Sequence, residues 1–224
     1  MSVDPITIAV DAAQTVSGLW QTPDRPSACL VLAHGAGAGM THPFMAAVAD
    51  GLQARAVASL RFQFPYMENR SKRPDRPALA HATIRAAVAT AVRLAPGLAL
   101  FAGGKSFGAR MTSQAQAEAP LTQVRGLVFL GFPLHPAGKP ADERARHLAQ
   151  MRVPMLFLQG SRDALANPAL LARTLETLAP AATLKLFDQA DHSFHVPKRS
   201  GRTDTELLHT VLDAAVSWMA ARRD

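Results

Sequence analysis

One pentapeptide of the chain, GKSFG at residues 104–108, combines residue types and spacing that can do chemistry. It follows the apolar run 98–102 and precedes an alanine-rich run with helical spacing. A strand, this G-x-S-x-G turn and a helix form a nucleophile elbow, in which a strained backbone lifts the serine hydroxyl clear of the chain. Small residues two before and two after the serine keep the turn free of collisions. The pattern therefore predicts that Ser106 is a nucleophile.

Two other interpretations of the same residues stay open at this point. Residues 104–106 match the end of a phosphate-binding P-loop, G-x-x-x-x-G-K-[ST]. That motif needs a glycine where this chain has Ala99, and a flexible loop where residues 98–102 indicate a buried strand. The glycines can also simply make a turn between strand and helix. The pentapeptide alone favours the elbow over both.

A serine hydroxyl is a weak nucleophile that needs a base, and the base needs an orienting carboxylate. Asp163 lies just after the apolar run 153–158, and His192 lies just after 183–187. Open parallel sheets carry their sites at the carboxyl ends of strands, and the order serine, acid, histidine is the one that accompanies this elbow. Ser106, Asp163 and His192 are therefore the predicted triad.

Each partner has a competitor nearby. His195 is in the same loop as His192, and we favour His192 because it follows the strand at once in a tight loop. Asp191 is adjacent to His192, and neighbouring side chains usually point apart, so we favour Asp163. The plainer alternatives are a turn aspartate and an exposed loop histidine.

Acyl transfer also needs backbone N–H groups that stabilise the oxyanion. We expect one from Phe107, directly after the serine, and one from Ala36 in the small-residue loop HGAGAG at 34–39. A merely flexible glycine-rich turn is the alternative for this loop, and its spacing fits a dinucleotide fingerprint poorly. The chemistry requires no metal and no organic cofactor, and we expect neither.

The elements that must position these groups alternate along the chain, which predicts an α/β fold with a mostly parallel sheet and helices on both faces. We expect strands at 6–10, 16–20, 28–33, 57–62, 98–102, 124–130, 153–158 and 183–187, the first two as an antiparallel pair. We expect helices at 43–55, 78–94, 107–117, 143–150, 168–178 and 204–222, and a loop at 63–77. No linker divides the chain, so residues 1–224 are predicted to form a single domain. Residues 131–152 are too few for a large cap domain.

Composition narrows the class of protein. The single cysteine, Cys29, allows no intramolecular disulfide, and no apolar run approaches the ~20 residues of a membrane span. With no signal-peptide pattern, we expect a cytoplasmic protein without membrane association. The net charge of +7 is partly clustered at 70–76, 198–202 and 222–223. Aromatic residues are scarce and no recognition motif accompanies these clusters, so we expect no nucleic-acid partner.

Six segments carry a resemblance to a known family: HGAG at 34–37, RFQFPY at 61–66, RPD at 73–75, GKS at 104–106, GFPLH at 131–135 and DHSF at 191–194. Over almost its whole length the chain resembles the α/β-hydrolases. More narrowly, it resembles small single-domain members that include testis-expressed and KAT8-complex-subunit-like proteins, and more distantly dienelactone-hydrolase-like proteins. The resemblance implies the α/β-hydrolase fold and the triad Ser106, Asp163 and His192. Ala109 departs from such elbows, which often have another glycine there.

These observations predict a serine hydrolase that cleaves a carboxylic ester, or a thioester, of a small substrate through an acyl-enzyme. The site is expected to be shallow and bordered by the loop 63–77, whose basic residues favour a small-molecule acyl substrate with a carboxylate or phosphate. The alternative is a binding or scaffold protein that keeps the fold with little activity. The sequence does not indicate an oligomeric state.

Overall fold

The computed structural model describes residues 3–223, and its centre is one sheet of eight strands in the order β1-β2-β4-β3-β5-β6-β7-β8. The strands are β1 (Val3–Ala9), β2 (Thr15–Gln21), β3 (Ala28–Ala33), β4 (Val57–Phe62), β5 (Leu100–Lys105), β6 (Val124–Leu130), β7 (Met155–Gly160) and β8 (Ala182–Phe187). β2 pairs antiparallel with β1 and with β4, whereas the other neighbouring strands pair in parallel. The predicted, mostly parallel sheet is confirmed.

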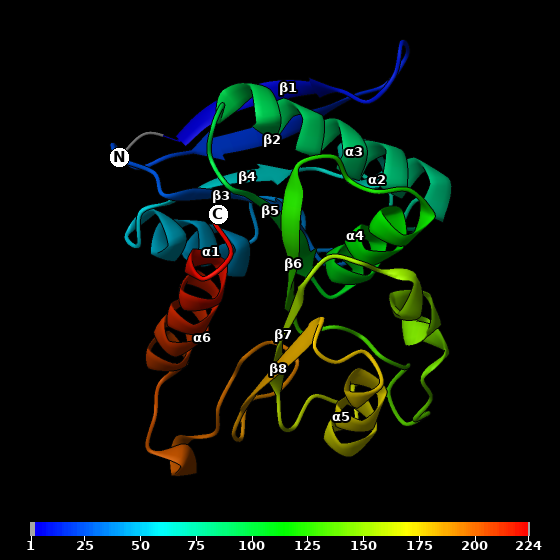
Figure 1. Ribbon diagram of the computed structural model, residues 1–224, viewed down its shortest axis with the longest axis vertical. Coiled ribbons are helices and arrows are strands. Elements are labelled where there is room, and N and C mark those ends of the chain that lie inside the picture. The colour runs from blue at the N-terminus through cyan, green and yellow to red at the C-terminus, as the bar shows by residue number, and fades with distance from the viewer. Residues whose placement is uncertain (1–2, 224) are drawn as a thin grey trace.

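Helices cover both faces of this sheet. They are α1 (Pro43–Gln53), α2 (Pro65–Glu68), α3 (Pro77–Leu94), α4 (Phe107–Glu118), α5 (Pro168–Glu176) and α6 (Asp204–Ala220), with short 3-10 helices η1 (Glu143–Gln150) and η2 (Lys198–Ser200). In Figure 1, α1 and α6 lie on one side of the sheet, and α3, α4 and α5 lie on the other. Between residues 3 and 223, no helix is both long enough and apolar enough to cross a lipid bilayer.

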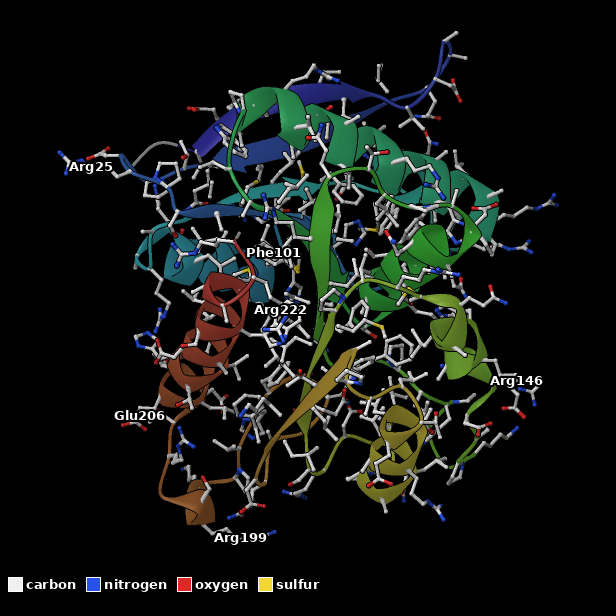
Figure 2. All side chains as sticks on the ribbon, in the orientation of Figure 1. Arg25, Phe101, Arg146, Arg199, Glu206 and Arg222 are labelled. Carbon is white, nitrogen blue, oxygen red and sulfur yellow. The ribbon has the colours of Figure 1, made fainter. Side chains whose placement is uncertain are left out.

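The core occupies the two layers between sheet and helices. Every residue of β3 and of β4 is buried, because strands covered on both faces expose neither side. On one face, Phe101, which is labelled in Figure 2, packs edge-on against Trp218 of α6, with ring centroids 6.1 Å apart. On the other face, Phe129 and Phe157 pack at 4.9 Å. The packing of these rings on both faces fixes the strands, and the carboxyl ends of the strands carry the site.

The position of β5 differs from its prediction. The expected strand was 98–102, but β5 begins at Leu100 and continues to Lys105. Gly104 is opposite Ala33 in the ladder with β3, and a Cβ atom on Gly104 would lie 2.3 Å from the Ala33 carbonyl oxygen. The glycines that indicated a turn are thus strand residues that allow a close approach of β3.

The loop 63–77 also differs in part, because it contains α2. Pro65 occupies the first helical turn, where its missing N–H is no loss. The carboxylate of Asp75 accepts a hydrogen bond of 3.1 Å from the backbone N–H of Tyr66, which folds the rest of the loop back onto the helix. Between β6 and β7 the chain contains only η1, so the described residues include no large cap at that position.

Candidate active site

Ser106 lies at the junction of β5 and α4 with φ 52° and ψ −112°, a backbone conformation that L-residues rarely adopt. Cβ atoms on Gly104 and Gly108 would come within 2.3 and 2.4 Å of one atom, the Ala33 carbonyl oxygen. Only glycine fits at these two positions without moving β3. The tight strand-to-helix turn expected of an elbow is therefore present, and it holds the Ser106 side chain at the carboxyl end of the sheet.

A chain of hydrogen bonds joins three of the predicted residues. The Oγ atom of Ser106 is 2.8 Å from Nε2 of His192, and Nδ1 of His192 is 2.7 Å from Oδ2 of Asp163. The side chain of Asp163 is inaccessible to solvent, while that of His192 is partly exposed. A carboxylate at Nδ1 requires a proton there, so Nε2 is left as the acceptor that faces the serine hydroxyl.

Asp163 is itself held by two further donors. Its Oδ1 atom accepts a hydrogen bond of 2.7 Å from the backbone N–H of Leu165, and its Oδ2 atom accepts one from the side-chain amide of Gln159. Gln159 is buried near the end of β7 and also accepts from the backbone N–H of Phe132. The carboxylate therefore cannot turn away from His192 without breaking three bonds.

The structure places both competitors elsewhere. Nδ1 of His195 lies 2.8 Å from an oxygen of Asp204, and His195 is exposed. Asp191 accepts backbone hydrogen bonds from Ser193 and His195, which makes it the cap of the loop. Neither side chain is hydrogen-bonded to Ser106. The geometry brings together Ser106, Asp163 and His192 and separates them from His195 and Asp191.

The two residues expected to donate backbone N–H groups to an oxyanion, Ala36 and Phe107, line the same cleft as Ser106. Phe107 begins α4, and Ala36 is exposed in the loop after β3. His34 anchors this loop from below. Its ring accepts a hydrogen bond of 3.1 Å from the backbone N–H of Phe64, and its Nδ1–H donates 2.8 Å to the carbonyl of Gly35.

A sequence profile of the family described as "Alpha/beta hydrolase domain" matches residues 26–220. The chain belongs to this family. The hydrolase is similar to several solved structures at low sequence identity. It shares 21% identity with a dienelactone hydrolase from Anabaena variabilis (TM-score 0.79, covering 100% of this chain and 99% of that one). It shares 20% identity with a serine hydrolase without lid from Xanthomonas campestris (TM-score 0.73, covering 96% of this chain and 94% of that one). It shares 16% identity with an esterase domain from Rhodothermus marinus (TM-score 0.74, covering 99% of each chain).

Two side chains of the hydrolase, one on α2 and one just after β4, hold the glycine-rich loop in place. The sequence had not indicated this role for them. The hydroxyl of Tyr66 accepts a hydrogen bond of 3.0 Å from the backbone N–H of Gly37. The side-chain oxygen of Gln63 accepts one of 2.8 Å from the backbone N–H of Met40. Polar residues directly after a buried strand were the available signal in the segment RFQFPY.

Lys105, which invited a phosphate-binding interpretation, is instead part of the packing around His192. Its ammonium group donates a hydrogen bond of 2.5 Å to the backbone carbonyl of His192. The same group lies 6.0 and 5.7 Å from the ring centroids of Phe44 and Phe194. Burial lowers the pKa of Lys105 to about 8. Lys105 is the last residue of a strand. A P-loop instead needs a flexible loop at this place.

The cleft of the hydrolase has two arms that share Ala36, Ser106 and Leu165. We call the first the apolar arm. It has a volume of about 300 Å³ and its other lining residues are Gly35, Ala38, His42, Phe44, Met45, Lys105, His192 and Ser193. We call the second the arginine arm. It has a volume of about 360 Å³ and its other lining residues are Pro74, Asp75, Pro77, Phe107, Arg110, Met111, Pro133 and Arg144.

The loop 63–77 borders the arginine arm, as expected, but through Pro74, Asp75 and Pro77. Its basic residues, Arg70, Lys72, Arg73 and Arg76, are all exposed and do not line the cleft. The contribution of this loop to the lining therefore comes from Pro74, Asp75 and Pro77, and not from its basic residues. Within residues 3–223, no three His, Cys, Asp or Glu side chains form a group that could hold a metal ion.

Proposed function

We propose that this hydrolase cleaves a carboxylic ester, or a thioester, of a small molecule through an acyl-enzyme on Ser106. The observation that carries the proposal is the hydrogen-bonded chain from Ser106 through His192 to Asp163, at 2.8 and 2.7 Å. A serine in a strained elbow with a base and a buried carboxylate behind it is the arrangement that activates a hydroxyl for acyl transfer. The family assignment and the esterase named among the similar structures agree with this chemistry.

In the proposed reaction, Nε2 of His192 takes the proton of Ser106 as the hydroxyl attacks the carbonyl carbon. Asp163 orients the imidazole and stabilises it while it is charged. The N–H groups of Phe107 and Ala36 receive the oxyanion, and each such donor contributes about 3–4 kcal/mol to the stability of the transition state. His192 then protonates the leaving alcohol or thiol, and a water molecule activated by the same histidine releases the acid. The chemistry uses only groups of this chain and water.

A fluorophosphonate probe tests the nucleophile, and the chain offers a matched control. Ser113 also has a histidine partner, since its hydroxyl is 2.8 Å from Nε2 of His147, but Ser113 is fully buried and lines neither arm. We expect mass spectrometry to find the probe on Ser106. Labelling should persist in Ser113→Ala and vanish in Ser106→Ala.

The same experiment separates the proposal from the binding-protein alternative. Failure of the folded wild-type protein to react with the probe, together with no turnover of a panel of acyl esters and thioesters, would reject the hydrolase mechanism and favour the alternative. Comparison of matched oxygen and sulfur esters decides which leaving group the site prefers. The cleft volumes of about 300 and 360 Å³ suit small substrates.

A further inference from the structure

Arg110 and Arg144 line the arginine arm beside Ser106 from two different elements. Arg110 is on α4, one helical turn after Ser106, and its backbone N–H donates 3.1 Å to the carbonyl of Ser106. Residues four apart on a helix share one face, so Arg110 projects from the same face as the elbow. Arg144 comes from η1, which packs against α4. Both side chains are half-buried.

Neither guanidinium group has a counterion within residues 3–223. The ion pairs of this part of the chain include neither arginine, and none of its hydrogen bonds involves either guanidinium group. The one side-chain hydrogen bond at Arg110 runs from the Ser113 hydroxyl to the Arg110 backbone carbonyl. The Nε atom of Arg110 is buried without any hydrogen-bond partner. A buried donor without an acceptor costs free energy, and a ligand that accepts a hydrogen bond there would recover it.

The positive charges of the arginine arm also favour a bound anion. Burial lowers the pKa of Arg110, and the positive charge of Arg144 in the same arm lowers it further. The third titratable neighbour, His147, has its pKa lowered to about 4 by burial and by the charge of Arg110, so it is neutral at pH 7. An anion between the arginines would remove this repulsion.

The carboxylate of Asp75 lowers the net positive charge of the arginine arm. It is the one acidic residue among the lining residues, and it is engaged by the backbone N–H of Tyr66. Two guanidinium groups and one carboxylate leave a single net positive charge. A singly charged carboxylate matches this balance, whereas a doubly charged phosphate exceeds it. The planar fork of an arginine also fits a carboxylate with two parallel hydrogen bonds.

We propose that Arg110 and Arg144 bind a carboxylate group of the substrate, so that the natural substrate is an ester or thioester bearing a free carboxylate. The inference rests on the proposed function for the reacting bond, but the anion site is a separate property. The scissile carbonyl lies at Ser106, where the two arms meet, and the carboxylate end of the substrate occupies the arginine arm.

Matched ester pairs test the proposal through the ratio of kcat/KM for the anionic and the neutral member. Para-nitrophenyl hydrogen adipate against para-nitrophenyl hexanoate places the carboxylate on the acyl part. Para-acetoxybenzoate against its methyl ester places it on the alcohol part. We expect the wild-type protein to prefer the anionic member of one pair, and Arg110→Gln or Arg144→Gln to lower that preference about 10- to 100-fold.

Four further variants make the result specific. Arg110→Lys keeps the charge without the fork and should lose an intermediate factor. Arg146, on the same 3-10 helix as Arg144, extends away from the molecule (Figure 2) and lines neither arm. Arg146→Gln, together with Arg73→Gln and Arg76→Gln in the exposed basic loop, should leave the preference unchanged. Equal losses on both members of each pair in Arg110→Gln would overturn the proposal.

A binding measurement separates this proposal from the proposed function. Calorimetric titration of adipate into Ser106→Ala should show binding that weakens at least tenfold when Arg110→Gln is added. If the wild-type protein cleaves no ester but this titration succeeds, the hydrolase mechanism fails and the anion site stands. If the wild-type protein cleaves esters but adipate binding does not depend on Arg110, the hydrolase mechanism stands and the anion site is overturned. Tighter binding of inorganic phosphate than of adipate would overturn the carboxylate assignment.

Discussion

The ammonium group of Lys105 donates a 2.5 Å hydrogen bond to the backbone carbonyl of His192. The residue directly before Ser106 therefore holds the loop that brings the imidazole to the serine. In sequence the two residues are far apart: Lys105 is the last residue of β5, and His192 is in the loop after β8. Because the acceptor is a backbone carbonyl, this contact fixes the distance between the elbow and the loop that contains His192. It does so independently of the hydrogen bonds that the imidazole makes.

Lys105→Met should lower kcat more than it raises KM. The variant keeps the volume of the side chain but removes a charged hydrogen bond, whose net value is about 1.5–3 kcal/mol. If that bond positions His192, kcat falls about 10- to 100-fold. Steady-state kinetics on para-nitrophenyl hexanoate provide the measurement. Lys185→Met, at an exposed position of β8, is the control and should behave as wild type. Equal kinetics for the two variants would contradict the positioning function.

Tyr66→Phe should weaken transition-state binding without weakening substrate binding. It removes the acceptor of the Gly37 N–H and thereby loosens the loop that carries Ala36. A neutral hydrogen bond contributes about 0.5–1.5 kcal/mol, so kcat should fall about 2- to 12-fold. The affinity for a trifluoromethyl ketone that mimics the tetrahedral intermediate should fall by a similar factor. A fall in melting temperature with unchanged affinity for the ketone would show that the hydroxyl serves only the fold.

Gly108→Ala should destabilise the protein by about 3 kcal/mol or more, because the added methyl group meets the Ala33 carbonyl oxygen at 2.4 Å. Gly138→Ala is the matched control. Gly138 has φ +71° but no atom within 4 Å of an added Cβ, so only backbone strain of about 1–2 kcal/mol applies. Urea denaturation of both variants measures the difference. Equal losses would mean that β3 moves aside at little cost.

The stability of the protein should fall as the pH drops from about 6.5 to about 4, in part through His34. Burial lowers the pKa of this fully buried residue from 6.5 to about 4. In this window the unfolded chain binds a proton that the folded protein does not, so acid favours unfolding by up to about 3 kcal/mol at the lower end. The free energy of unfolding of His34→Asn should depend less steeply on pH than that of the wild-type protein. Parallel slopes would contradict the assignment.

The existence of all eight strands, and the bounds of three of them, could be predicted from the sequence. The segments 28–33, 57–62 and 124–130 have the predicted bounds, because a strand covered on both faces is an unbroken apolar run with an abrupt polar end. Ser106, Asp163 and His192 follow β5, β7 and β8, and because parallel strands end at one edge of a sheet, the proximity of the three residues was foreseeable even without the strand bounds. By contrast, the end of β5 was misplaced, because glycines that admit a close neighbour have the same appearance in sequence as glycines that turn the chain.

The cleft lining was less predictable because it depends on which way a loop turns. The basic cluster at 70–76 is conspicuous in sequence but faces solvent. Arg110 is inside a helix and Arg144 inside a short 3-10 helix, so neither stands out from an ordinary solvated side chain. Only the packing of η1 on α4 brings the two arginines beside Ser106. The same limit applied to Lys105, whose partner, the His192 carbonyl, lies in the loop after β8.

The two arms of the cleft meet only at Ala36, Ser106 and Leu165. Each half of a substrate is therefore selected by its own set of side chains. Substitutions at Phe44 or Met45 alter one half of the preferred molecule, and substitutions at Arg144 alter the other. Substrate range in this protein can consequently diverge in two independent directions, one arm at a time, while the reacting groups stay fixed.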